Sequence, residues 1–234
     1  MLLKAALAEG KYDRLILLQG LEYPIQSNKQ ISTFCKRYHD TEFIKAQNIS
    51  DSKRISDIHK YCLYWMFDKA SVNPCVKLTH LCNKKFVELG LVPHLKKNYV
   101  KDCKGNKMKI YQGCAQFGLT KEAAEYLVEF YDNNPQVNKY FKSMFAPDES
   151  YFHTIIYNSS FVNKTVDGCA VTGNNLTDFE NLTYFEYPNQ IRLFTEPSEF
   201  EQLRSSGLLF FRKASSLSNR LLDYIDMQHQ EDDY

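Results

Sequence analysis

The start of the chain constrains the fold most, because a helical segment there leads quickly into a short apolar run. Residues 2–9 have helical composition, and Gly10 is a typical helix stop. Residues 14–19 hold four consecutive apolar side chains between turn residues, a pattern typical of a buried strand that is central and parallel. A helix, a short loop and a buried strand predict an α/β fold, entered near its middle.

Further elements are expected along the rest of the chain. The clearest helix is 120–131, because Thr120 can cap it and an apolar stripe follows. Residues 51–70 mix basic and aromatic side chains and favour neither helix nor strand. Other helices are expected at 29–39, 78–89, 199–205 and 221–227, strands at 41–46, 109–113, 182–187 and 208–213, and a loop or hairpin at 96–109. No linker splits the chain, so one domain over residues 1–234 is expected.

Pro147, Asp148 and Glu149 predict a helix start that carries carboxylates. Proline is tolerated where a helix opens, and the helix dipole favours acids in the first turn. Apolar residues at 152, 155 and 156 let one face pack while the acidic end lies at the mouth of a pocket. A carboxylate held there should stay ionised and suits a general base. A capped surface helix is the alternative, and it is the commoner use of such acids.

The formal net charge of +1 gives no electrostatic case for nucleic-acid binding. The sequence contains no glycine-rich phosphate loop and none of the common zinc-protease or serine-hydrolase motifs. It also lacks an Asp-x-Asp motif for a divalent ion, so any diphosphate would have to be neutralised by cations. Arg192 and the pair Arg212–Lys213, at or just beyond predicted strands, are the candidates. Solvated charges at strand ends are the alternative.

Five segments carry a family resemblance. In chain order they are D-R-L-I-L-L-Q-G-L-E-Y-P-I-Q-S-N at 13–28, G-C-A-Q-F-G-L-T at 113–120, P-D-E-S-Y-F-H-T-I-I-Y-N-S at 147–159, R-L-F-T at 192–195 and S-G-L-L-F-F-R-K at 206–213. They resemble motifs of the core-2/I-branching β-1,6-N-acetylglucosaminyltransferase family, which includes the peptide O-xylosyltransferases. The family's patterns for the first, third and fifth are D-x-x-x-L-L-S-G-x-D-x-P-I-K-S/T-N, P-D-E-x-F-F-Q-T-L-L-x-N-S and S-G-A-L-F-A-R-K-F.

The resemblance implies a GT-A-like α/β fold, a mixed sheet flanked by helices. It implies inverting transfer of N-acetylglucosamine or xylose from a UDP-sugar to a glycan or protein hydroxyl, with neither a metal nor another cofactor. The Glu of P-D-E, the catalytic base, corresponds to Glu149. The Arg and Lys that neutralise the leaving diphosphate correspond to Arg192 and Lys213. Weaker candidates for contacts to donor or acceptor are Glu22, Tyr23, Arg54, Lys60, Trp65 and Asp148.

The chain departs from the family pattern at several points. Glu22 replaces the loop Asp, and Ile191 precedes Arg192 where Pro is usual. The sequence starts after the family's first uridine-binding strand and loop, so we expect the C-terminal two thirds of the fold, lacking the first nucleotide-binding strands. A catalytically inactive remnant that binds glycan or a partner protein is therefore a second hypothesis.

The cellular compartment is inferred from the thiols and from hydropathy. Seven cysteines, an odd number without a C-x-x-C pair, favour reduced thiols in the cytoplasm. No apolar run reaches the length of a membrane span. We therefore expect a cytoplasmic protein, with peripheral membrane association as the alternative, although eukaryotic members of the family are Golgi membrane proteins.

Overall fold

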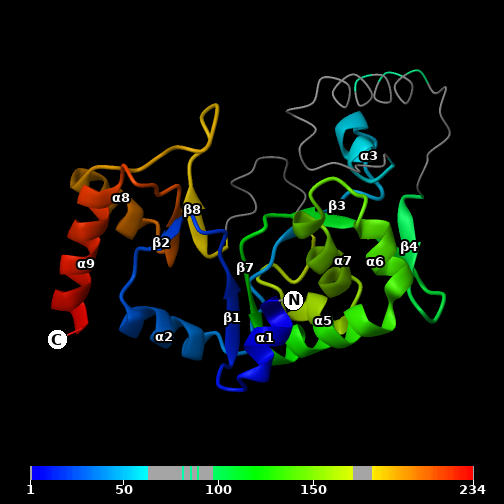
Figure 1. The fold of residues 1–234 in the computed structure, drawn as a ribbon, viewed down its shortest axis with the longest axis horizontal. Coiled ribbons are helices and arrows are strands. Elements are labelled where there is room, and N and C mark those ends of the chain that lie inside the picture. The colour runs from blue at the N-terminus through cyan, green and yellow to red at the C-terminus, as the bar shows by residue number, and fades with distance from the viewer. Residues whose placement is uncertain are drawn as a thin grey trace. The chain divides into compact units, whose positions relative to one another are not determined.

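The computed structural model describes residues 2–62, 81, 85, 89, 97–170 and 181–233. Its helices and small sheets confirm the expected mixed α/β class (Figure 1). The chain forms two compact units: unit 1 comprises Met1–Ala46, Gly113–Tyr126 and Ser160–Tyr234, and unit 2 comprises Gln47–Gln112 and Leu127–Ser159. The single domain expected over residues 1–234 and the GT-A-like topology stay predictions.

Unit 1 contains two small sheets within the described residues. One pairs β1 with β7, and the other is mixed, because β9 runs antiparallel to β2 and parallel to β8. The elements are α1 (Leu2–Ala8), β1 (Arg14–Leu17), β2 (Glu22–Pro24), α2 (Asn28–Arg37), β7 (Phe117–Thr120), η2 (Ser160–Lys164), β8 (Thr183–Phe185), η4 (Pro197–Glu199), α8 (Phe200–Ser205), β9 (Phe210–Arg212) and α9 (Asn219–Asp233).

Strand β1 differs from its expectation. It is half-buried along its whole length and pairs antiparallel with β7, instead of lying buried between parallel neighbours. The buried position belongs to β7, whose residues are all buried and whose Gly118 also forms a bridge to Phe43. An apolar run alone cannot reveal this, because the partner strand lies about a hundred residues further along the chain.

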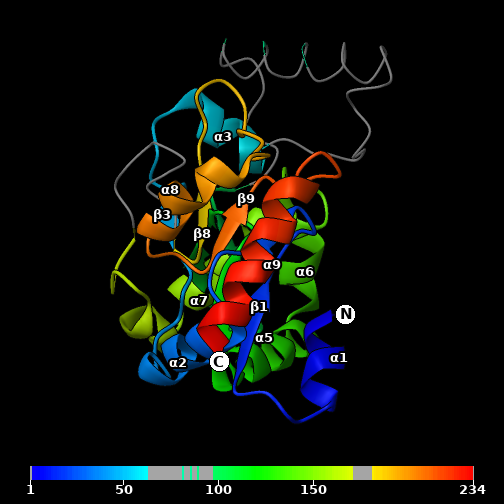
Figure 2. The ribbon, with the colours of Figure 1, turned by 90° about the vertical axis from the view of Figure 1, so that its left-hand side faces the viewer.

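The core of unit 1 holds β9 against the segment around Phe194. The rings of Phe194 and Phe211 pack edge to face, with their centroids 5.7 Å apart. Helix α9 packs onto the mixed sheet through Leu221 and Ile225 (Figure 2). The buried cluster consists of Ile25, Phe194, Phe200, Leu203, Phe211, Ala214, Leu221 and Ile225. This packing fixes the backbone of the segments that carry Arg192 and Lys213.

Unit 2 combines short strands with helices around a core that includes Ile110 and Ile155. Of the loop or hairpin expected at 96–109, the structure shows a hairpin, the antiparallel pair of β4 with β5. Helix α5 (Lys121–Asn133) begins in unit 1 and ends in unit 2. The elements are β3 (Ala46–Asn48), α3 (Ile55–Cys62), β4 (Tyr99–Lys101), β5 (Lys107–Lys109), β6 (Tyr111–Gly113), α6 (Pro135–Phe141), η1 (Pro147–Glu149) and α7 (Tyr151–Tyr157).

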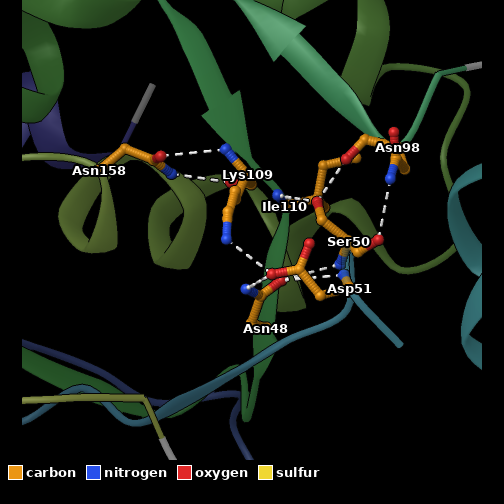
Figure 3. Close-up of polar contacts among 7 residues, drawn as sticks. All are labelled: Asn48, Ser50, Asp51, Asn98, Lys109, Ile110 and Asn158. Carbon is orange, nitrogen blue, oxygen red and sulfur yellow. Dashed lines mark hydrogen bonds and ion pairs between the residues drawn. The ribbon is translucent and has the colours of Figure 1, made fainter. Parts of the chain in front are cut away.

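Polar contacts connect the turn after β3 to the hairpin and to the end of α7 (Figure 3). The hydroxyl of Ser50 accepts from the backbone N–H of Ile110 at 2.6 Å and donates to the carbonyl of Asn98. The amide of Asn158 bonds both backbone groups of Lys109, at 3.0 and 2.7 Å. These bonds satisfy backbone groups of Asn98, Lys109 and Ile110, in and beside the hairpin.

The helices expected at 29–39, 120–131, 199–205 and 221–227 are confirmed, the last continuing to Asp233. At 41–46 only isolated bridges form, and the strand begins at Ala46. The helix expected at 78–89 lies outside the described residues, apart from three positions. No helix in the described ranges is both long enough and apolar enough to cross a bilayer.

Candidate functional site

Glu149 ends a single 3-10 turn, and Ser150 separates it from the start of α7 at Tyr151. Asp148 and Glu149 lie in this tight turn, which leads into α7. No side chain caps the start of the 3-10 turn or the start of α7. Ala146, just before the turn, has a φ of 42°, a left-handed conformation that costs a non-glycine residue about 1–2 kcal/mol. Glu149 is half-buried, Asp148 is exposed, and Ile155 is fully buried. This strained turn fixes where the Glu149 carboxylate lies.

The Glu149 carboxylate has an amide partner that the sequence did not predict. Nε2 of Gln112 donates to Oε2 of Glu149 at 3.0 Å, and Nζ of Lys60 donates to Oε1 of Gln112 at 2.7 Å. Burial raises the pKa of Glu149, the Gln112 hydrogen bond opposes that rise, and the charge of Asp148 adds to it. A helix dipole alone would favour the ionised form. Burial instead makes the carboxylate a stronger base.

Arg54 and Lys60, expected near an acceptor, converge on the buried carboxylate of Asp57. Nε of Arg54 donates to Asp57 at 2.8 Å, and Nζ of Lys60 lies 3.6 Å from it. The hydroxyl of Ser52 also donates to Asp57, at 2.6 Å. The hydrogen bonds from Arg54 and Ser52, together with the charge of Lys60, offset the cost of burying this carboxylate. Trp65, the remaining candidate in this stretch, lies outside the described residues.

The two cations expected to bind a diphosphate are neighbours in unit 1. The backbone N–H of Lys213 donates to the carbonyl of Arg192 at 3.2 Å, and the N–H of Phe194 donates to the carbonyl of Lys213 at 3.1 Å. The guanidinium of Arg192 is paired with Glu186 at 2.7 Å and with Glu199 at 2.5 Å. The hydrogen bond from Arg192 lowers the pKa of Glu186 and raises that of Arg192.

Glu22, a candidate for contact with donor or acceptor, is instead engaged by neighbouring side chains of the protein. Its side chain is fully buried, forms an ion pair with Arg212, and accepts from Nε2 of Gln116 at 2.8 Å. Burial would raise its pKa, but the bonds from Arg212 and Gln116 outweigh that effect and lower it. Tyr23 donates to Asp226 at 2.7 Å, and burial together with that bond raises the pKa of the phenol to about 12. These contacts hold the loop around β2 in place.

Gln112 and Gln116 are partners of candidate residues that the sequence did not predict. Arg212, expected as a cation at a strand end, forms an ion pair with Glu22. Gln112 and Gln116 lie in or beside the matched segment at 113–120, and Arg212 is next to Lys213. Their position in or next to a matched motif was the only sequence signal that could have identified these residues. Within the described ranges, no three His, Cys, Asp or Glu side chains gather as metal ligands would. The expected metal independence stays a prediction.

Comparison with known proteins identifies the family. The family model of the core-2/I-branching enzyme matches residues 1–172, which include Glu149. The chain therefore belongs to the core-2/I-branching enzyme family. It is similar to xylosyltransferase 2 of Canis lupus familiaris, Rattus norvegicus and Homo sapiens, at 24% identity over 233 residues in each case. The matches cover 92% of this chain but only 23% of each relative.

Proposed function

We propose that this chain is a glycosyltransferase that moves a sugar, N-acetylglucosamine or xylose, from a UDP-sugar to a hydroxyl of a glycan or protein. Transfer inverts the anomeric centre and needs no metal ion, on a GT-A-like fold. Family membership and the name xylosyltransferase 2 of the relatives support the sugar-transfer class. The observation that carries the proposal is the half-buried Glu149 carboxylate, held by Gln112 through one oxygen.

In the proposed reaction Glu149 is the general base. The carboxylate takes the proton of the acceptor hydroxyl while that oxygen attacks the anomeric carbon. The new carbon–oxygen bond forms on the face opposite the leaving group, so the configuration inverts. The bond between the anomeric carbon and the diphosphate breaks, and UDP leaves with the bonding electron pair.

Arg192 and Lys213 are proposed to stabilise the charge that develops on the departing diphosphate. Guanidinium and ammonium groups suit phosphate oxygens, and placed donors of this kind contribute strongly when charge builds up in a transition state. Two backbone hydrogen bonds, from Lys213 to Arg192 and from Phe194 to Lys213, support a joint role for these cations.

The decisive test is Glu149→Gln. The amide keeps the shape of the side chain but cannot take a proton, so transfer should fall by roughly a hundredfold to ten-thousandfold. Sugar transfer is measured with and without EDTA, and unchanged unfolding by denaturant serves as the control for the fold. A Glu149→Gln protein that transfers sugar at the normal rate would refute the base assignment.

A second candidate function is binding of glycan or a partner protein without catalysis. The observation that favours it is the double pairing of Arg192 with Glu186 and Glu199, because a guanidinium held by two carboxylates is already neutralised. A diphosphate would have to displace at least one of them.

Calorimetry with UDP separates the two candidates. If Arg192 binds the diphosphate, Arg192→Met should weaken UDP binding about tenfold to a hundredfold, the value of a charged hydrogen bond. Arg220→Met is the matched control, since Arg220 is an exposed arginine of the same unit and is paired with Glu196. No UDP binding by the unmodified protein would favour the non-catalytic candidate.

A further inference from the structure

We propose that Gln112 and Lys60 are positioning residues that present one oxygen of the Glu149 carboxylate to the acceptor and hold the other. The inference rests on the proposed function of Glu149 as base. It reassigns Lys60 from a candidate for substrate contact to a residue that acts through Gln112. The Glu149 network is defined here as Asp57, Lys60, Gln112 and Glu149, all within unit 2.

The chemistry of the two partners fixes the orientation of the Gln112 amide. An ammonium group can only donate and an ionised carboxylate can only accept. The amide oxygen must therefore face Lys60 and the amide nitrogen must face Glu149, as observed at 2.7 and 3.0 Å. A flipped amide would lose both hydrogen bonds. Gln112 is only 6% exposed, so water is a poor substitute for either partner.

Lys60 is itself held in place from two sides. Helix α3 places it one turn after Asp57, whose carboxylate lies 3.6 Å from its ammonium group. Its backbone carbonyl accepts from the N–H of Phe145 at 3.2 Å, two residues before Pro147. One residue thus supports both the turn that carries Glu149 and the amide that bonds its carboxylate.

The network leaves the two oxygens of Glu149 in different states. Oε2 accepts the Gln112 hydrogen bond, whereas no described residue forms a hydrogen bond with Oε1. Oε1 is therefore the oxygen that takes the acceptor proton. The charged groups that act on the Glu149 carboxylate are Asp148 on its own turn and Lys60 on α3, and Lys60 is in turn paired with Asp57, which also binds Arg54. Lys60 and Gln112 favour the ionised carboxylate, while Asp148 disfavours it.

Carbon-13 NMR of labelled glutamate carboxyls in the intact protein tests the network directly, with Glu149→Gln assigning the signal. Gln112→Met and Lys60→Met should each raise the pKa of Glu149. The double variant should raise it by less than the sum of the single shifts, because Lys60 acts through Gln112. Lys60→Arg keeps the charge and should restore most of the normal value. The exposed residues Lys53 and Gln136 provide the matched controls Lys53→Met and Gln136→Met, which should not shift it.

An unchanged pKa of Glu149 in Gln112→Met, or additive shifts in the double variant, would overturn the proposal. If the buried Gln112→Met protein does not fold, Lys60→Met still decides, because Lys60 is partly exposed and its replacement should be tolerated.

Kinetics provide the second measurement. In Gln112→Met, kcat should fall about tenfold to a hundredfold, as expected for a misplaced catalytic group, with little change in the acceptor KM. The acid limb of the pH–rate profile should move to higher pH, which a purely structural defect would not cause. A normal kcat and pH profile in this variant would refute positioning while Glu149 remained the base. Absence of transfer by the unmodified protein would instead refute the proposed function, and the NMR titration would still test the network.

Discussion

At the scale of single residues, the behaviour of Glu149 depends on neighbours that are distant in sequence. Its motif indicated a carboxylate at a helix start, and the structure adds burial and a hydrogen bond from Gln112. These effects oppose each other, since burial raises the pKa and the amide lowers it. The result is a carboxylate whose pKa is raised, but by less than it would be without the Gln112 hydrogen bond.

The pH dependence of transfer follows from this balance. A base works only when deprotonated, so activity should fall as pH drops through the pKa of Glu149, at a higher pH than for an ordinary glutamate. Asp148→Asn removes a negative charge that raises this pKa, so the acid limb should move to lower pH. High salt should shrink the displacement, because Asp148 is exposed and its charge is screened.

The matched control for this pH prediction is Glu129→Gln, the removal of an exposed acid of the same unit. Rates of sugar transfer are measured across the acidic range for all three proteins. An acid limb that stays in place in Asp148→Asn would contradict the electrostatic explanation.

At the scale of secondary structure, strand β7 packs closely against Leu182, the residue just before β8, because β7 has a glycine, Gly118, at the point of contact. A Cβ built on Gly118 would lie 2.6 Å from Cδ1 of Leu182, which is buried. Gly118→Ala should therefore lower the free energy of unfolding by about 1–3 kcal/mol through overpacking. Denaturant unfolding followed by circular dichroism measures this change.

A double-variant cycle isolates the clash. Leu182→Val shortens the opposing side chain and costs some stability by itself. In that background Gly118→Ala should cost less than it does alone, because the methyl group gains room. Equal costs in both backgrounds would show that the loss comes from the backbone and not from Leu182.

At the scale of the whole molecule, the proposed functions are divided between the two units. Arg192 and Lys213 belong to unit 1, and Glu149 with its network belongs to unit 2. Each unit is assembled from separate stretches of the chain, so neither unit corresponds to a single continuous segment of the sequence.

Hydrogen exchange tests this division of roles. UDP should slow amide exchange in unit 1, around residues 192–194 and 210–213, because those segments carry the proposed diphosphate ligands. An acceptor analogue should slow exchange in unit 2, around residues 145–157. Mass spectrometry of the intact protein with each ligand gives the comparison, and a protein without ligand is the baseline. UDP protection confined to unit 2 would contradict the assignment of Arg192 and Lys213.

The sequence alone determined what depends on short-range pattern. Capping residues and apolar periodicity located α2 and α5, turn residues located the β4–β5 hairpin, and motif order pointed to the family that the comparison confirmed. What only the tertiary structure decided depends on contacts between distant residues. It paired β1 antiparallel with β7, and it placed Gln112 between Lys60 and Glu149. Strand partners and buried hydrogen bonds are chosen by three-dimensional packing, which local periodicity does not encode.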